Sequence, residues 1–136
     1  MRLSKYLSCL LVSFFSVYAV AQTPEVGYSG EIPYISGGIG SDESDAIQLE
    51  AKKWPLMLQF SQIDEKGWGS WVSGVMVRIV NSQNEEVFAC KSDGPFLLLG
   101  LKPGEYLIGA SYEGVSREKA VTVKAGKPEK VSIYWK

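Results

Sequence analysis

Residues 93–106 read Asp93-Gly94-Pro95-Phe96-Leu97-Leu98-Leu99-Gly100-Leu101-Lys102-Pro103-Gly104-Glu105-Tyr106. The order is a turn, a short apolar strand, a proline-glycine turn and the start of a second strand. Pro103 presets its own φ and Gly104 accepts a positive φ, so the pair suits the central positions of a type II turn. This stretch predicts a small antiparallel β-sandwich.

The same pattern extends over most of the chain. Downstream of Pro55, apolar and polar side chains alternate in short runs, as in strands with one buried face. Polar turns such as Asn81-Ser82-Gln83-Asn84 and Glu113-Gly114 separate these runs. We expect strands near 56–61, 75–80, 86–91, 96–99, 106–112, 119–124 and 130–135. Seven short strands at this spacing predict a mainly β fold.

Residues 41–53 form the one helix that we expect. Ser41 or Asp42 can cap its start, and the remaining charges follow the order that the helix macrodipole favours. Carboxylates occupy the first turn and lysines the last: Asp42, Glu43, Asp45, then Lys52 and Lys53. Ile47, Ala51 and Trp54 make a narrow apolar stripe. Pro55 ends the helix by forcing Trp54 out of the helical region.

The first 21 residues have the features of a cleaved signal peptide. Arg2 and Lys5 precede an apolar run over 7–20, and Ala19-Val20-Ala21 is a small-residue cleavage site. A membrane anchor is the alternative, but the run is shorter than the roughly 20 residues that span a bilayer. We therefore expect a periplasmic or secreted protein that begins at Gln22 and has no membrane span.

The remaining 115 residues suit a single domain. We expect an arm and helix over 22–55, with an extended arm or edge strand at 22–35, followed by a β-sandwich over 56–136. Removing Arg2 and Lys5 from 14 basic residues leaves 12 against 15 acidic ones, a net charge of −3 that predicts no nucleic-acid partner. Only Cys90 remains, either buried in a strand or paired between molecules.

Four motifs resemble the carboxypeptidase regulatory-like domains: Val72-Ser73-Gly74-Val75, Ser92-Asp93-Gly94-Pro95-Phe96, Leu101-Lys102-Pro103-Gly104-Glu105-Tyr106 and Val121-Thr122-Val123-Lys124-Ala125-Gly126. The resemblance implies a transthyretin-like sandwich of seven antiparallel strands with Greek-key connections, the first motif lying in a strand. It also implies an accessory, adhesive or peptide-binding module without a shared active site. Residues 35–43 are similar to a segment that precedes this domain in small exported proteobacterial proteins.

Several kinds of chemistry are excluded or disfavoured by composition. The chain has no histidine, so it cannot build a Ser-His-Asp or Cys-His catalytic unit. One cysteine with carboxylates makes a poor zinc site, and we expect no metal, cofactor or catalytic residue. Gly37-Gly38-Ile39-Gly40-Ser41 could cradle an anion, but a turn with a helix cap is the better interpretation because acidic residues follow it. A paired-carboxylate glycosidase site stays a remote alternative.

The candidate binding segment is Asp64-Glu65-Lys66-Gly67-Trp68-Gly69-Ser70-Trp71. Trp68 and Trp71 flank a Gly-Ser pair in an expected loop, and exposed tryptophans are typical of interface hot spots. Tyr28 and Tyr34 of the arm are further candidates for aromatic contacts. In the alternative interpretation, Trp71 belongs to a core strand and Trp68 packs over a sheet edge.

These observations favour an exported, non-enzymatic β-sandwich that binds another envelope or secreted protein or serves in envelope assembly. Docking would use exposed aromatic loops or an unpaired edge strand. Homo-oligomers are possible. The alternative is a module that binds glycans or peptidoglycan fragments, and a small hydrolase is the remote alternative.

Overall fold

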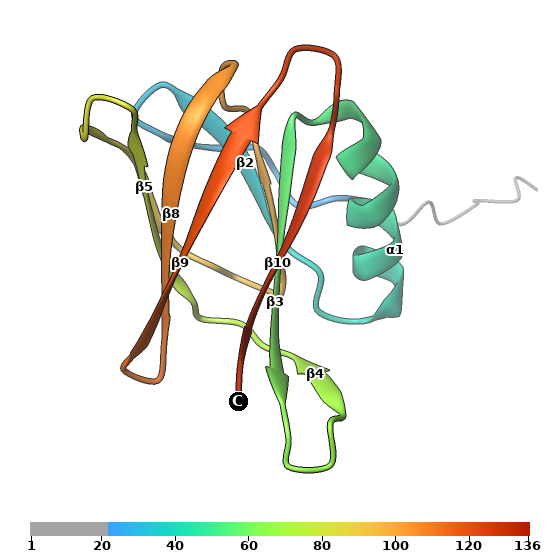
Figure 1. The fold of residues 1–136 in the computed structure, drawn as a ribbon. Helices are drawn as coiled ribbons and strands as arrows, with labels where there is room; N and C mark the ends of the chain where they lie inside the picture. The colour runs from blue at the N-terminus through green and yellow to red at the C-terminus, as the bar shows by residue number, and fades with distance from the viewer. Residues whose placement is uncertain (1–21) are drawn as a thin grey trace, which may run out of the picture.

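The computed structural model describes residues 22–136, so the expected signal peptide lies outside the described residues. Within these residues the chain forms two β-sheets and one α-helix (Figure 1). The first sheet has the order β1 (Gly27–Ser29), β2 (Ile32–Gly37), β7 (Phe96–Leu99), β3 (Leu56–Ile63) and β10 (Glu129–Trp135), and β4 (Gly69–Trp71) also pairs with β3. The second has the order β6 (Glu86–Lys91), β5 (Met76–Asn81), β8 (Gly104–Tyr112) and β9 (Val115–Val123). The expectation of a mainly β fold is confirmed.

The main core lies between the two sheets. Alternate residues of β3 point into it, and Leu56, Leu58 and Phe60 are fully buried there. They pack with the inward residues of β5 and β7, such as Ile79 and Leu97. Burying each such side chain contributes about 1.5–3 kcal/mol, so this alternation favours folding.

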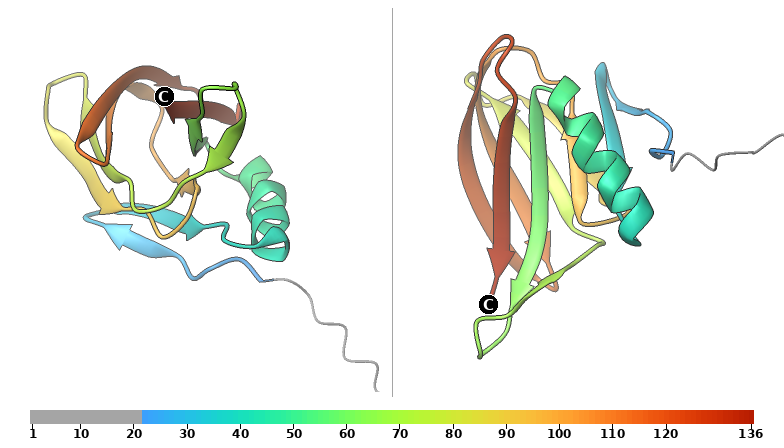
Figure 2. Two further views of the ribbon diagram at one scale, coloured as in Figure 1. Left: turned by 90° about the horizontal axis from the view of Figure 1, so that it is seen from below. Right: turned by 90° about the vertical axis from the view of Figure 1, so that its right-hand side faces the viewer.

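A second core lies on the outer face of the first sheet, where the helix α1 (Ser41–Glu50) and a following 3-10 turn (Ala51–Lys53) cover it. Figure 2 shows the helix against this face. Its members are Ile35, Ile47, Met57, Phe96 and Leu98, and Ala51 and Trp54 pack against them. Strand β7 is therefore buried on both faces, which explains its uninterrupted apolar run.

The helix follows the expected bounds, and Trp54 ends it in an extended conformation before Pro55. Its start differs from the expectation, because Gly40 occupies the capping position and no side chain caps the helix. Glu43 instead reaches back, and its Oε1 accepts a hydrogen bond from the Gly38 N–H at 2.8 Å. The glycine segment is thus a turn whose amide is already engaged by a carboxylate.

The chain has ten strands within the described residues rather than seven. The additional ones are β1, β2 and β4. Strand β2 is not at an edge, because it pairs with β1 on one side and with β7, whose residues lie 59 to 65 positions further along the chain, on the other. The expectation of purely antiparallel pairing is also wrong, since β10 and β3 are parallel. The β2–β7 and β3–β10 pairings join strands that are far apart in the sequence, so no hairpin turn between them indicates the pairing.

Two local expectations need correction. Residues 72–75 do not form a strand: Gly74 has φ 73°, which interrupts extended structure, and the segment is held instead by Ser92, whose Oγ accepts from the Val75 N–H at 3.0 Å. Gly104 has φ 157° and opens strand β8, so its extended backbone does not match a type II turn.

The turn at Asp93-Gly94 docks closely on β2. The Asp93 N–H donates to Ser36 Oγ at 2.8 Å, and a Cβ on Gly94 would collide with the backbone carbonyl of Gly37. The glycine is required by this backbone contact, which fixes β7 beside β2. Across residues 22–136, no helix is both long and apolar enough to cross a membrane.

Candidate docking surface on the β3–β4 hairpin

Strands β3 and β4 form a hairpin whose tip projects beyond the body of the molecule (Figure 1, Figure 2). Its turn is organised by Asp64, whose Oδ1 accepts hydrogen bonds from the N–H groups of Lys66 and Trp68, both at 2.9 Å. The Asp64 N–H also donates to the Trp68 carbonyl at 2.9 Å. Gly67 supplies the positive φ of 82° that the turn needs. These hydrogen bonds order the backbone of the turn at Trp68.

Both tryptophans of the hairpin are exposed. Trp68 is 72% exposed and Trp71 is 56% exposed. The Trp71 ring packs against the Phe96 ring of the second core in a tilted arrangement, with 4.9 Å between the ring centroids and 58° between the ring planes. Strand β4 does carry Trp71, but at the sheet surface rather than in the core between the sheets.

A third aromatic side chain shares the surface of Trp71. Ser61 of β3 is paired with Trp71 on one side and with Tyr134 of β10 on the other, so the three side chains form one row across the sheet. Because Phe60 points into the main core, this row lies on the outer face. Tyr134 is 47% exposed, and its strand lies about 10 Å from that of Trp71.

The remaining sequence candidates do not join this surface. Tyr28 is 70% exposed on β1, which lies away from the hairpin tip (Figure 2). Tyr34 is half-buried and packs edge-on against Phe88, with ring centroids 5.3 Å apart. Tyr34 thus contributes to the core, and of the four sequence candidates only Trp68 and Trp71 lie on the β3–β4 hairpin.

Sequence reasoning missed Tyr134 and the role of Asp64. The alternation of Val131, Ile133 and Trp135 placed Tyr134 on the opposite face, but its position beside Trp71 depends on the parallel β10–β3 pairing. Asp64 is part of the candidate segment 64–71, but its hydrogen bonds to the turn are not predicted. The Asp-x-x-Gly spacing before Trp68 was the available signal, since aspartate commonly bonds backbone amides two residues on.

Side chains bridge the two seams between the sheets, which are the gaps between the edge strands β1 and β6 and between the edge strands β9 and β10. Ser29 Oγ of β1 donates to the Ala89 carbonyl and accepts from the Ala89 N–H of β6, both at 3.1 Å. On the other seam, Arg117 Nε and Lys119 Nζ of β9 reach the carbonyls of Tyr134 and Ser132 at 3.4 and 3.5 Å. These contacts occupy edge positions that another strand would need.

The reactive groups of the described residues are sparse. Cys90 lies half-buried on β6, and burial, with a smaller effect from Asp93, raises its pKa to about 12. At neutral pH this thiol is protonated and therefore a poor nucleophile. Among residues 22–136, no three side chains of the histidine, cysteine, aspartate and glutamate types are grouped so that they could hold a metal ion.

The fold and this surface define a mainly β protein of two packed sheets that presents an aromatic hairpin. A scan against family models finds no match for the chain, and a search of curated proteins finds none either.

Proposed function

We propose that the protein is an exported, non-enzymatic module that binds another envelope or secreted protein through the β3–β4 hairpin. One observation carries the proposal: Trp68 and Trp71 are both largely exposed on a hairpin whose turn is ordered by Asp64. A loop whose backbone is already ordered loses less conformational entropy when a partner covers it. Removal of such an anchor typically costs 2 kcal/mol or more of binding, as at interface hot spots.

The bridged seams favour the hairpin over strand addition. Ser29 covers the β6 edge, and Arg117 and Lys119 reach across to β10. An incoming strand would have to displace these side chains before it could pair. The absence of histidine and the high pKa of Cys90 support a role in binding rather than catalysis.

We further propose that the sandwich is a transthyretin-like, carboxypeptidase regulatory-like domain. The strand order supports this: β7 returns to lie beside β3, while the intervening β5 and β6 form part of the opposite sheet. This arrangement resembles a Greek key that spans two sheets, because β7, the fourth of the strands β3, β5, β6 and β7, returns to pair with the first. It differs from the immunoglobulin order, in which the first two strands pair.

Photo-crosslinking in the native cells tests the docking surface. Trp68→p-benzoylphenylalanine is expected to yield one discrete adduct with an envelope protein or with a second copy of this chain. Tyr28→p-benzoylphenylalanine is the matched control, because Tyr28 is equally exposed but lies on β1. No adduct at either position, or the same adducts at both, would refute docking through the hairpin.

Export is tested separately by cell fractionation. We expect the chain in the periplasmic or secreted fraction, with Gln22 as its first residue by mass spectrometry. Recovery of uncleaved chain in the cytoplasm would contradict export without bearing on the hairpin.

A glycan or peptidoglycan fragment is the second candidate ligand. The row of Trp71, Ser61 and Tyr134 favours it, because two aromatic rings with a hydroxyl between them can stack on sugar rings and bind a sugar hydroxyl. Titration with cell-wall oligosaccharides should then change tryptophan fluorescence, and Tyr134→Ala should weaken the response. An unchanged spectrum at millimolar oligosaccharide would exclude this ligand class.

A further inference from the structure

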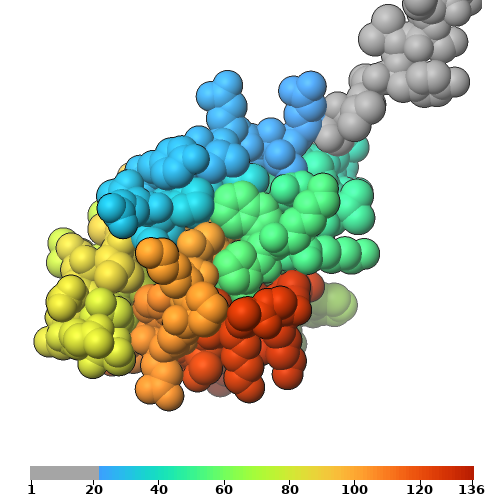
Figure 3. All heavy atoms as spheres, turned by 90° about the horizontal axis from the view of Figure 1, so that it is seen from above, coloured from blue at the N-terminus to red at the C-terminus, as the bar shows by residue number. Residues whose placement is uncertain are grey.

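A second surface lies at the opposite end of the sandwich from the hairpin. Residues 52–55 after the helix, 101–103 before β8 and 123–128 between β9 and β10 meet there and enclose a depression of about 390 Å³. Figure 3 views this end of the molecule, where the green, orange and red segments come together. We call this depression the lysine pocket, because Lys52, Lys53, Lys124 and Lys127 contribute to its wall.

The side chains that line the lysine pocket are of only two kinds. Apart from the four lysines, they are apolar, and they include Trp54, Pro55 and Leu101. Of the residues that the structure describes, none with a hydroxyl, amide or carboxylate side chain lines it. The indole N–H of Trp54 is already engaged, since it donates to Glu50 Oε1 at 3.2 Å.

The charge of the pocket contrasts with that of the whole chain, whose net charge is −1. Within the described part of the chain, four lysines and no acidic residue line the pocket. Lys53 Nζ lies 3.6 Å from Glu50, whereas Lys52, Lys124 and Lys127 have no ion-pair partner within 4 Å among residues 22–136. This end of the molecule therefore attracts anions.

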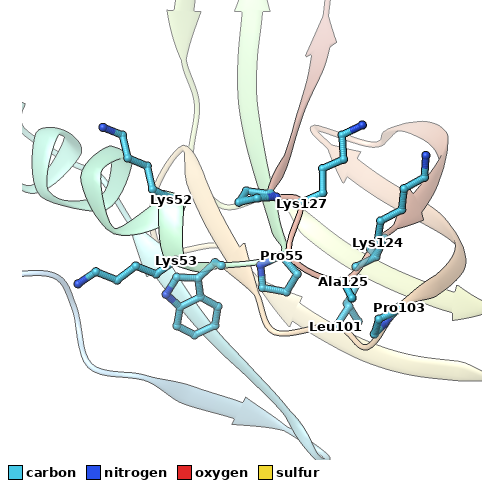
Figure 4. Close-up of a pocket in the computed structure, with 12 residues that line it drawn as sticks. Lys52, Lys53, Pro55, Leu101, Pro103, Lys124, Ala125 and Lys127 are labelled. Carbon is cyan, nitrogen blue, oxygen red and sulfur yellow. The ribbon is translucent and has the colours of Figure 1, made fainter.

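The lysines surround the mouth instead of meeting at one point. Figure 4 shows the ammonium groups of Lys52, Lys53, Lys124 and Lys127 spread around Pro55 and Ala125 and directed outward. Their aliphatic stems add to the apolar wall while their charged ends remain in water. A lone small anion would meet no convergent set of donors. A ligand with an apolar body and an anionic end would meet both kinds of side chain.

The same lining disfavours other ligands. Among residues 22–136 the lining offers lysine donors but no side-chain acceptor, so the O–H groups of a neutral sugar or the N–H groups of a peptide main chain would find no side-chain acceptor there to replace water. Insertion into a membrane would require apolar groups that protrude, whereas Leu101 is buried at the base of a recess.

We propose that the lysine pocket binds a single-chain anionic amphiphile. The apolar chain lies against Trp54, Pro55 and Leu101, and a phosphate or carboxylate headgroup lies among the lysines at the mouth. The volume is within the range of about 300–1,000 Å³ that small-molecule sites occupy. The site is independent of the β3–β4 hairpin, so either proposal can fail without the other.

Dodecyl phosphate, kept below its micelle concentration, is the first probe. We expect saturable one-to-one binding by calorimetry, weakened by salt, with amide NMR shifts concentrated at residues 52–55 and 124–128. Inorganic phosphate has only the anionic group and dodecanol only the apolar chain. Each should therefore bind at least roughly tenfold more weakly than dodecyl phosphate. The same titration with dodecanoate measures whether a carboxylate headgroup is bound as well as a phosphate headgroup. Shifts scattered over the sandwich, or no saturable binding of either amphiphile, would overturn the proposal.

Two pairs of variants separate the pocket from general charge and folding effects. Lys52→Gln with Lys124→Gln should weaken binding about tenfold, whereas Lys66→Gln with Lys91→Gln, which changes net charge equally elsewhere, should not. Ala125→Trp should fill the mouth and abolish binding, while Ala125→Ser should bind as the unaltered protein does. Equal loss in both lysine pairs, or full binding by Ala125→Trp, would refute the site.

Discussion

The ring of Trp71 lies on the ring of Phe96, and this contact joins the exposed hairpin to the core beneath the helix. Phe96 is buried between that helix and the sheet, while Trp71 covers its remaining edge and stays more than half exposed. One aromatic pair therefore links the candidate docking surface to the second core, and the two partners should respond very differently to truncation.

Phe96→Ala should lower the free energy of unfolding by about 3–5 kcal/mol, because it leaves a cavity in the second core. Trp71→Ala should cost only about 1 kcal/mol, since much of its ring is already in water. Urea unfolding of both variants measures the difference. A larger loss for Trp71→Ala than for Phe96→Ala would contradict the packing described here.

Gly94→Ala should destabilise the protein by about 1–3 kcal/mol, the range typical of overpacking. The added Cβ would meet the Gly37 carbonyl, which belongs to the backbone and cannot rotate away. Gly69→Ala is the matched control, because a Cβ there has no neighbour within 4 Å. In urea unfolding, the free energy of unfolding should therefore fall for Gly94→Ala. For Gly69→Ala it should stay within a few tenths of a kcal/mol of the parent's value.

Asp64→Ala should loosen the turn that carries Trp68, because it removes the acceptor for two backbone N–H groups. Hydrogen exchange of the Lys66 and Trp68 amides should accelerate, at a cost in global stability of about 1 kcal/mol or less. Glu65→Ala is the control, since within residues 22–136 the Glu65 side chain makes no hydrogen bond or ion pair. Equal acceleration in both variants would show that Asp64 does not order the turn.

Cys90 should be unreactive in the native protein. Burial raises its pKa to about 12 from an ordinary value of 9.0, so the reactive thiolate is scarce at pH 8. Alkylation by iodoacetamide in the folded protein should be at least roughly tenfold slower than in urea. Comparable rates in the two states would contradict this environment for the thiol.

The same pKa shift predicts a pH dependence of stability. The folded protein holds the Cys90 proton more tightly than the unfolded chain does, so the contribution is fully present below about pH 9 and is lost as the pH rises toward about 12. Burial also raises the pKa of Tyr106, so the test is the difference between the parent and Cys90→Ala. The parent should lose more stability than the variant across this alkaline interval.

Local patterns predicted much of the fold. The alternation of β3 and β10 identified the residues that face the core, and Pro55 marked where the helix ends. The stripe of Ile47, Ala51 and Trp54 identified the face of the helix that packs on the sheet. Each of these features depends on residues only a few positions apart, so the chain itself carries the signal.

The pairing of distant strands was not predictable in this way. Strand β2 joins β7 through the Ser36 hydroxyl and through the close backbone approach of Gly37 and Gly94, contacts that no periodicity reveals. The three residues of β4 are too few to show alternation. The row of Trp71, Ser61 and Tyr134 requires the register of three strands at once.

Residue order alone thus established which side chains are apolar, where the turns fall and which catalytic units the chain cannot build, because these follow from composition and short spacings. Tertiary structure decided which surfaces exist. It placed Trp68 and Trp71 in solvent, put Tyr34 against Phe88, and gathered lysines from two distant segments around one depression. Such surfaces arise from long-range packing, whose energy depends on every strand in the two sheets and not on any one stretch of the chain.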